Sequence, residues 1–172
     1  IVVRLVGSEM CIRDSICAAK TGGHIFPALS FSKEALKNNN RITFIGTNTE
    51  LERKIFLQNE NIKFIKFDLD GFRGKGISQK LAFLIRLPLI FVQVISIIVS
   101  KNISSVFCFG GFISIPVGFA SIVTFRNLYL HEQNAIVGSS NKLLSIFAKK
   151  VFTAFPISCL LYTSDAADDI PR

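Results

Sequence analysis

The stretch Thr21-Gly22-Gly23-His24-Ile25-Phe26-Pro27-Ala28-Leu29 decides the fold. It follows a short apolar run, Ile16-Cys17-Ala18-Ala19, which we predict to be a buried strand, and it leads into a helix from His24 to about Lys37. Glycines let backbone N–H groups approach a phosphate, and the dipole of the following helix favours negative charge there. The sequence therefore predicts an anion-binding corner between this strand and this helix.

Two further corners have the same character. Phe109-Gly110-Gly111-Phe112 follows a predicted strand over 105–109, and His131-Glu132-Gln133-Asn134-Ala135 follows another over 127–131. A single glycine pair before a helix is common, but three such corners after strands are not. Because ligands bind beyond the carboxyl ends of parallel strands, we expect all three corners at one edge of a sheet.

The rest of the chain continues the alternation of strands and helices. Strands are predicted at 41–46, 62–67 and 151–154, and helices at 49–58, 81–99, 114–124 and 136–149, with Thr47 or Asn48 as a helix cap. This order indicates an α/β fold, a Rossmann-like parallel sheet with helices on both faces. The side chains expected to face the sheet are Phe26, Leu29, Ala35 and Leu36 from the first helix and Leu143, Leu144, Ile146 and Phe147 from the last.

Composition limits the possible partners. The chain has 172 residues, nearly half of them apolar, which suits one domain with a substantial core. Its net charge of +8 suggests an acidic partner such as nucleic acid, a phosphate-bearing substrate or an anionic membrane. No nucleic-acid motif, GxGxxG fingerprint, Walker loop or zinc spacing occurs, so no nucleic acid, metal or cofactor is expected. The four cysteines lack paired spacing, which fits a reducing compartment.

The two ends differ from the rest. Two short segments near the ends can be encoded by nucleotide sequences that are largely reverse complements of each other. They are Met10-Cys11-Ile12-Arg13-Asp14-Ser15 and Cys159-Leu160-Leu161-Tyr162-Thr163-Ser164. Such inverted repeats resemble the transposon adapters used to prepare sequencing libraries. We expect residues 1–15 and 159–172 to be adapter-derived and 16–158 to be the native domain. Adapter residues then stand in for the start of the first strand. The alternative is a native strand over 1–6 and a polar tail.

The segment 81–99 is the most apolar, and its length approaches that of a membrane span. Arg86, Pro88 and Gln93 make burial in lipid costly, which favours a helix packed partly on the sheet. An exposed apolar patch there would suit an anionic membrane surface. The basic residues close to it in sequence are Arg73, Lys75, Lys80 and Arg86.

The corners carry the candidate functional side chains, and local sequence leaves their roles open. His24 is either a base or a hydrogen-bond donor to a phosphate, or else a capping or packing residue. Glu132 is a general base or a partner of a sugar hydroxyl, and Asn134 binds a hydroxyl or carbonyl group or shapes the turn. Phe112 covers a sugar or packs, and His131 is more simply structural.

Five blocks together resemble the N-terminal half of the MurG family of glycosyltransferases, over about residues 16–158. In order they are 21–29, Phe44-Ile45-Gly46-Thr47, Gly71-Phe72-Arg73-Gly74-Lys75-Gly76, 109–112 and 131–135. The resemblance implies the N-terminal, acceptor-side domain of a GT-B enzyme. Such enzymes transfer N-acetylglucosamine from UDP-GlcNAc to lipid I (undecaprenyl-pyrophosphoryl-MurNAc-pentapeptide) with inversion, making lipid II for peptidoglycan.

The same resemblance implies a peripheral enzyme on the cytoplasmic face of the bacterial inner membrane that needs no cofactor. It also implies that a C-terminal donor domain is missing, so that this stretch alone is inactive. His24 and Glu132 are the implied candidates for the catalytic base. The implied substrate-binding residues are Thr21, Gly22, Gly23, Gly110, Gly111, Phe112 and Asn134, and the implied membrane or phosphate contacts are Arg73 and Lys75.

Two departures from the family pattern stand out. Ala19 and Lys20 occupy positions where the family usually has glycines, and Phe112 replaces a frequent tyrosine, so any role of its hydroxyl is lost. Two other readings remain open. One is a non-catalytic module that binds lipid pyrophosphate or the membrane surface, and it would not depend on a UDP-sugar. The other is a different sugar-nucleotide enzyme of the same architecture.

Overall fold

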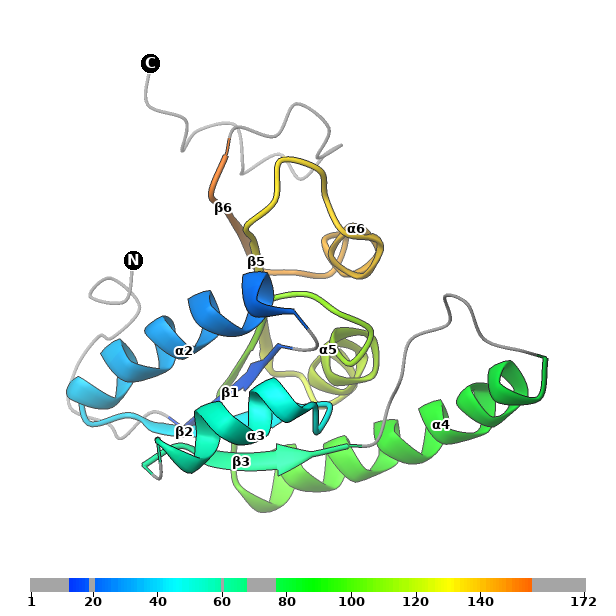
Figure 1. Cartoon of the computed structure of the whole chain (residues 1–172), viewed down its shortest axis with the longest axis horizontal. Coiled ribbons are helices and arrows are strands. Elements are labelled where there is room, and N and C mark those ends of the chain that lie inside the picture. Colours follow the sequence, from blue (N-terminus) through cyan, green and yellow to red (C-terminus); the bar gives the residue numbers. More distant parts are fainter. Residues whose placement is uncertain (1–12, 19–20, 60, 68–76, 156–172) are drawn as a thin grey trace.

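A computed structural model describes residues 13–18, 21–59, 61–67 and 77–155. Its centre is a parallel sheet of six strands in the order β3-β2-β1-β4-β5-β6, as Figure 1 shows. The strands are β1 (Arg13–Cys17), β2 (Arg41–Gly46), β3 (Lys63–Lys66), β4 (Ser105–Cys108), β5 (Asn127–Glu132) and β6 (Lys150–Thr153). This order reverses at β1 and β4, where a doubly wound sheet opens its ligand crevice.

Helices cover both faces of the sheet (Figure 1). They are α2 (Gly22–Lys37), α3 (Glu50–Leu57), α4 (Ile77–Ser100), α5 (Ser114–Val123) and α6 (Ser139–Leu144). One apolar cluster joins α2 and α3 to the sheet through residues such as Ile25, Phe44 and Phe56. The other joins α4, α5 and α6 through residues such as Val94, Val117 and Leu144. The predicted Rossmann-like fold is therefore confirmed.

Three local features differ from the sequence-based expectation: one helix cap, the extent of the last helix and the exposure of four side chains. The N-cap of α3 is Thr49, not Thr47 or Asn48, because Thr49 and Glu52 form a reciprocal capping box. The last helix, α6, is shorter at both ends than the predicted 136–149, and its N-cap Gly138 has an extended backbone with φ of −64° and ψ of 146°. Of the predicted sheet-facing side chains, Phe26 is exposed at the start of α2, and Leu143, Ile146 and Phe147 are exposed around α6.

Helix α4 lies against α5 and the sheet, as predicted. Within the part of the chain that the structure describes, no helix combines the length and the apolar character required to cross a bilayer.

The start of β1 carries two poorly accommodated polar side chains. Asp14 and Ser15 pair with β2 and β4 in the middle of the sheet and are both buried. One carboxylate oxygen of Asp14 and the hydroxyl of Ser15 have no hydrogen-bond partner among the described residues. Burial raises the pKa of Asp14 to about 6, although a hydrogen bond from Ser105 opposes the shift. An apolar pair would suit this central strand better.

Asp14→Asn is expected to stabilise the protein at pH 7. Folding raises the pKa of this carboxyl from 3.8 to about 6. When the carboxyl is ionised in both the folded and the unfolded protein, the shift lowers the free energy of unfolding by about 3 kcal/mol. When it is protonated in both, the shift has no effect. The stability difference between variant and wild type should therefore be largest above pH 6 and fade towards pH 4. Urea unfolding at pH 7 and pH 4 measures this difference. A gain of the same size at both pH values would contradict the explanation.

A second stabilising substitution lies at the end of α5. Phe125 has φ of 55° and its side chain is 96% exposed. The N–H of Phe125 donates to the Ile122 carbonyl, and the N–H of Arg126 donates to the Ser121 carbonyl. This pattern of bonds places Phe125 at the C′ position of α5, where glycine is favoured. Phe125→Gly should raise the free energy of unfolding by about 1 kcal/mol. Phe125→Ala removes the same exposed ring but keeps the positive φ, so it should gain much less in the same urea titration.

Candidate functional site

The structure brings the three predicted corners together at the carboxyl edge of the sheet. We call Thr21–His24 the first corner, 109–112 the second and 131–135 the third. A Cβ atom added to Gly110 would lie 2.7 Å from Cδ2 and 2.8 Å from Nε2 of His24, so the imidazole lies directly against the glycine. The same Cβ would lie 3.8 Å from the side-chain nitrogen of Asn141, which contacts the third corner.

In the first corner, Thr21 orients His24. Thr21 occupies the N-cap position of α2, but its hydroxyl makes no cap bond and instead shares a 2.6 Å hydrogen bond with Nδ1 of His24. The other ring nitrogen, Nε2, faces Gly110. Gly22 and Gly23 form the first turn of α2, where backbone N–H groups have no acceptor within the helix. The corner thus combines an oriented imidazole with N–H groups suited to an anion.

The second corner is a tight turn that needs glycine. Gly110 and Gly111 have φ of 100° and 89°, values that side-chain-bearing residues rarely adopt. The hydroxyl of Ser114 donates to the Gly110 carbonyl at 2.9 Å and fixes the turn to the start of α5. Phe112 follows the turn and is about one-third exposed. The backbone of this corner can therefore approach a ligand closely.

The third corner is organised by Glu132, which is 1% exposed. One of its oxygens accepts from the backbone N–H and the side-chain amide of Asn134, both at 3.0 Å. The other oxygen accepts from the Gly138 N–H at 2.9 Å and from the Asn141 amide at 3.0 Å. A single carboxylate thereby holds the whole loop between β5 and α6.

These bonds also determine the charge of Glu132. Burial raises its pKa, but the hydrogen bonds from Gly138, Asn134 and Asn141 outweigh burial and hold the pKa below its ordinary value. A carboxylate that is ionised, buried and occupied by four donors is a poor proton acceptor. The geometry favours a structural role for Glu132 and leaves His24 as the better placed candidate base.

The neighbouring His131 lies on the other face of β5. Its ring contacts that of Phe109, with the ring centres 5.0 Å apart. Burial lowers its pKa, although Gln133 and Glu132 act in the opposite direction. Asn134 is exposed and is positioned by Glu132. Arg73 and Lys75 lie outside the described residues.

Sequence reasoning missed Asn141 and Gly138, both of which bind Glu132. One signal was available for Asn141. It precedes the buried Leu144 by three residues, so the two share a helix face, and a polar residue on an apolar face is unusual. No sequence signal marks Gly138, because only its backbone N–H is used.

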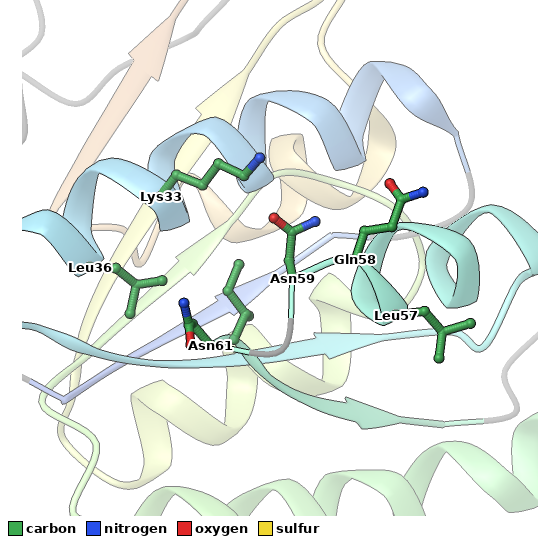
Figure 2. Close-up of a pocket in the computed structure, with 7 residues that line it drawn as sticks. Lys33, Leu36, Leu57, Gln58, Asn59 and Asn61 are labelled. Carbon is green, nitrogen blue, oxygen red and sulfur yellow. The ribbon is translucent and has the colours of Figure 1, made fainter.

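A separate hollow of about 520 Å³ lies elsewhere on the surface. Figure 2 shows it between the C-terminal ends of α2 and α3, with Lys33, Leu36, Leu57, Gln58, Asn59 and Asn61 around it. These helix ends lead into the starts of β2 and β3, so the hollow is at the opposite edge from the three corners. Among the described residues, no group of histidine, cysteine and acidic side chains could hold a metal ion.

Comparisons with known proteins agree with the architecture. The family model of the glycosyltransferase family 28 N-terminal domain matches residues 16–153. A crystal structure of Acinetobacter baumannii MurG superposes with a TM-score of 0.74 at 32% identity, covering 84% of this chain and 42% of that one. The resemblance drawn from the five sequence blocks is confirmed.

Curated relatives give the same result. A UDP-N-acetylglucosamine–N-acetylmuramyl-(pentapeptide) pyrophosphoryl-undecaprenol N-acetylglucosamine transferase of Psychrobacter cryohalolentis is 41% identical over 138 residues. A protein of the same name from Sulfurihydrogenibium is 39% identical over 144 residues. The match covers 80% and 83% of this chain but only 38% and 41% of those relatives, so the chain spans about two-fifths of their length.

Proposed function

The chain belongs to the glycosyltransferase family 28 N-terminal domain family, and from this premise we propose that it is the acceptor-binding domain of an inverting N-acetylglucosaminyltransferase. The acceptor is a muramoyl-pentapeptide linked through pyrophosphate to a polyprenol, as the names of its relatives describe for those proteins. The observation that carries the proposal is the meeting of His24 with Gly110 beside the first turn of α2.

The chemistry follows from this arrangement. In the proposed reaction, the C4 hydroxyl oxygen of the muramoyl sugar bonds to the anomeric carbon of N-acetylglucosamine. The bond from that carbon to UDP breaks, and UDP leaves with the electron pair. The hydroxyl proton passes to a base, for which His24 is the candidate, since its bond to Thr21 orients the ring. The N–H groups of Gly22, Gly23 and Gly111 would bind phosphate oxygens.

A matched pair of variants at Gly22 tests phosphate binding. Thr21 already has φ of −113° and ψ of 146°, which suits the residue before proline, and the first helical position tolerates proline. Gly22→Pro deletes one N–H donor, whereas Gly22→Ala adds a similar contact with the exposed Phe26 ring but keeps the N–H. Calorimetry with a short-chain lipid I analogue should show affinity about tenfold or more lower for the proline variant than for the alanine variant. Equal affinities would contradict the proposal.

We also propose that the protein associates peripherally with an anionic membrane, on its cytoplasmic face, through α4. Ile85, Leu89, Val92 and Val99 are each about 60% exposed, and their spacing places them on one side of the helix. Arg86 is exposed in the same helix. An apolar stripe with a neighbouring cation suits insertion into the headgroup region of acidic lipids.

Vesicle flotation distinguishes this stripe from the rest of the surface. We expect the double variant Ile85→Ser, Leu89→Ser to bind phosphatidylglycerol vesicles about tenfold or more weakly than wild type. The control is Leu57→Ser, because Leu57 is 77% exposed on α3, across the sheet. Equal loss in both proteins would mean that the binding is not specific to α4.

A further inference from the structure

Asn141 lies between the second and third corners and has no part in the proposed reaction. It belongs to α6 and is 2% exposed. Its side-chain amide donates to Glu132 at 3.0 Å and to the His131 carbonyl at 3.1 Å. The same nitrogen would be 3.8 Å from a Cβ atom on Gly110. One buried amide group thus bonds to the end of β5 and to the carboxylate of the third corner, and it lies next to the glycine turn of the second.

The bond to the His131 carbonyl explains why an amide is useful here. The carbonyl of Glu132 accepts from Ala154, on the β6 side of β5. Successive carbonyls of a strand point in opposite directions, so that of His131 points towards β4. However, β4 ends at Cys108 and the chain turns at Gly110. The amide of Asn141 therefore takes the place of a strand donor at the point where the sheet opens.

The orientation of this amide is fixed. Both of its protein partners are acceptors, so only the NH₂ group can face them. The amide oxygen is buried and has no hydrogen-bond partner among the described residues. A leucine would fill the same space without leaving an unsatisfied oxygen, so packing alone does not explain an asparagine at this position.

We propose that Asn141 is a positioning residue that holds the second and third corners in one arrangement, and with them the imidazole of His24 against Gly110. The inference rests on the proposed function, because the corners that it aligns are those assigned to the acceptor. Asn141 acts through Glu132 and the Gly110 turn and does not touch the reacting atoms.

Its first test needs no ligand. Asn141→Leu removes one of the four donors to Glu132, so the pKa of that carboxyl should rise above its wild-type value. NMR titration of the Glu132 side-chain carbon in the whole chain measures the change. Ser145→Ala, which removes an exposed bond to Lys142 near the end of α6, should leave this pKa unchanged. An unchanged pKa in Asn141→Leu would overturn the proposal.

The second test measures coupling to His24. Asn141→Leu should weaken binding of the short-chain lipid I analogue about threefold or more, and the loss should shrink when His24 is already alanine. Additive losses, or a loss of the same size in Ser145→Ala, would overturn the positioning role. If the wild-type chain does not bind the analogue, the proposed function fails and the positioning role fails with it. Normal binding with additive losses would overturn the positioning role alone.

Discussion

Glu132→Gln is expected to destabilise the protein by about 2–4 kcal/mol although it changes the side-chain shape little. The two backbone N–H groups that Glu132 binds, those of Asn134 and Gly138, bond to different oxygens. Whichever way a glutamine amide is turned, its NH₂ group opposes one of them. The asparagine side chains can rotate, but a backbone N–H cannot, so one of these two donors loses its acceptor and faces an NH₂ group. Urea unfolding at pH 7 measures the loss.

The pH dependence of this loss identifies its cause. The pKa of Glu132 is lowered by folding, so the carboxylate contributes stability above the unfolded-state pKa and loses it as the pH falls through the folded-state value. The difference between wild type and Glu132→Gln should thus be constant near neutrality and decrease in acid. The control is Glu34→Gln, because the Glu34 carboxylate forms an exposed ion pair with Lys37. This substitution should cost less than about 0.5 kcal/mol. Equal effects at both positions would rule out the loop-holding role.

Gly110→Ala is expected to cost about 2–4 kcal/mol and to displace His24. The substitution places a side chain on a residue with φ of 100°, and its Cβ would overlap the imidazole at 2.7 and 2.8 Å. The ring must move away from the corner, so binding of the lipid I analogue should fall together with stability. Chemical denaturation and calorimetry on the same protein measure both effects.

Two further variants separate the contributions to this cost. Gly23→Ala is the same chemical change at a helical position where the new Cβ is 3.9 Å from the nearest atom, the Thr21 hydroxyl, and it should be neutral or slightly stabilising. Adding His24→Ala to Gly110→Ala removes the overlap but not the positive φ. This double variant should recover part of the lost stability. If it recovers none, backbone strain alone explains the cost of Gly110→Ala.

Much of the fold could be predicted because each element carries its own signal. The strand over 41–46 and the helix over 114–124 are bounded by glycine, asparagine or threonine and have a clear apolar pattern, and the structure places β2 and α5 there. The last helix was predicted too long. Its apolar residues suggest a helix from Ile136, but Glu132 accepts a hydrogen bond from the N–H of Gly138, whose extended backbone makes it the N-cap of α6. A side-chain hydrogen bond to a residue six positions away overrode local helix propensity.

The sequence by itself determined the α/β architecture and the family, and it located three glycine- or polar-rich corners at strand ends, because periodicity and turn residues are local properties. The tertiary structure alone decided what these corners do to one another. Only the adjacency of β1 and β4 in the sheet brings His24 against Gly110, and only the return of α6 to the end of β5 brings Asn141 to Glu132. Whether Glu132 is a free base or an occupied carboxylate depends on donors two, six and nine residues away along the chain, and only folding assembles all of them around one side chain.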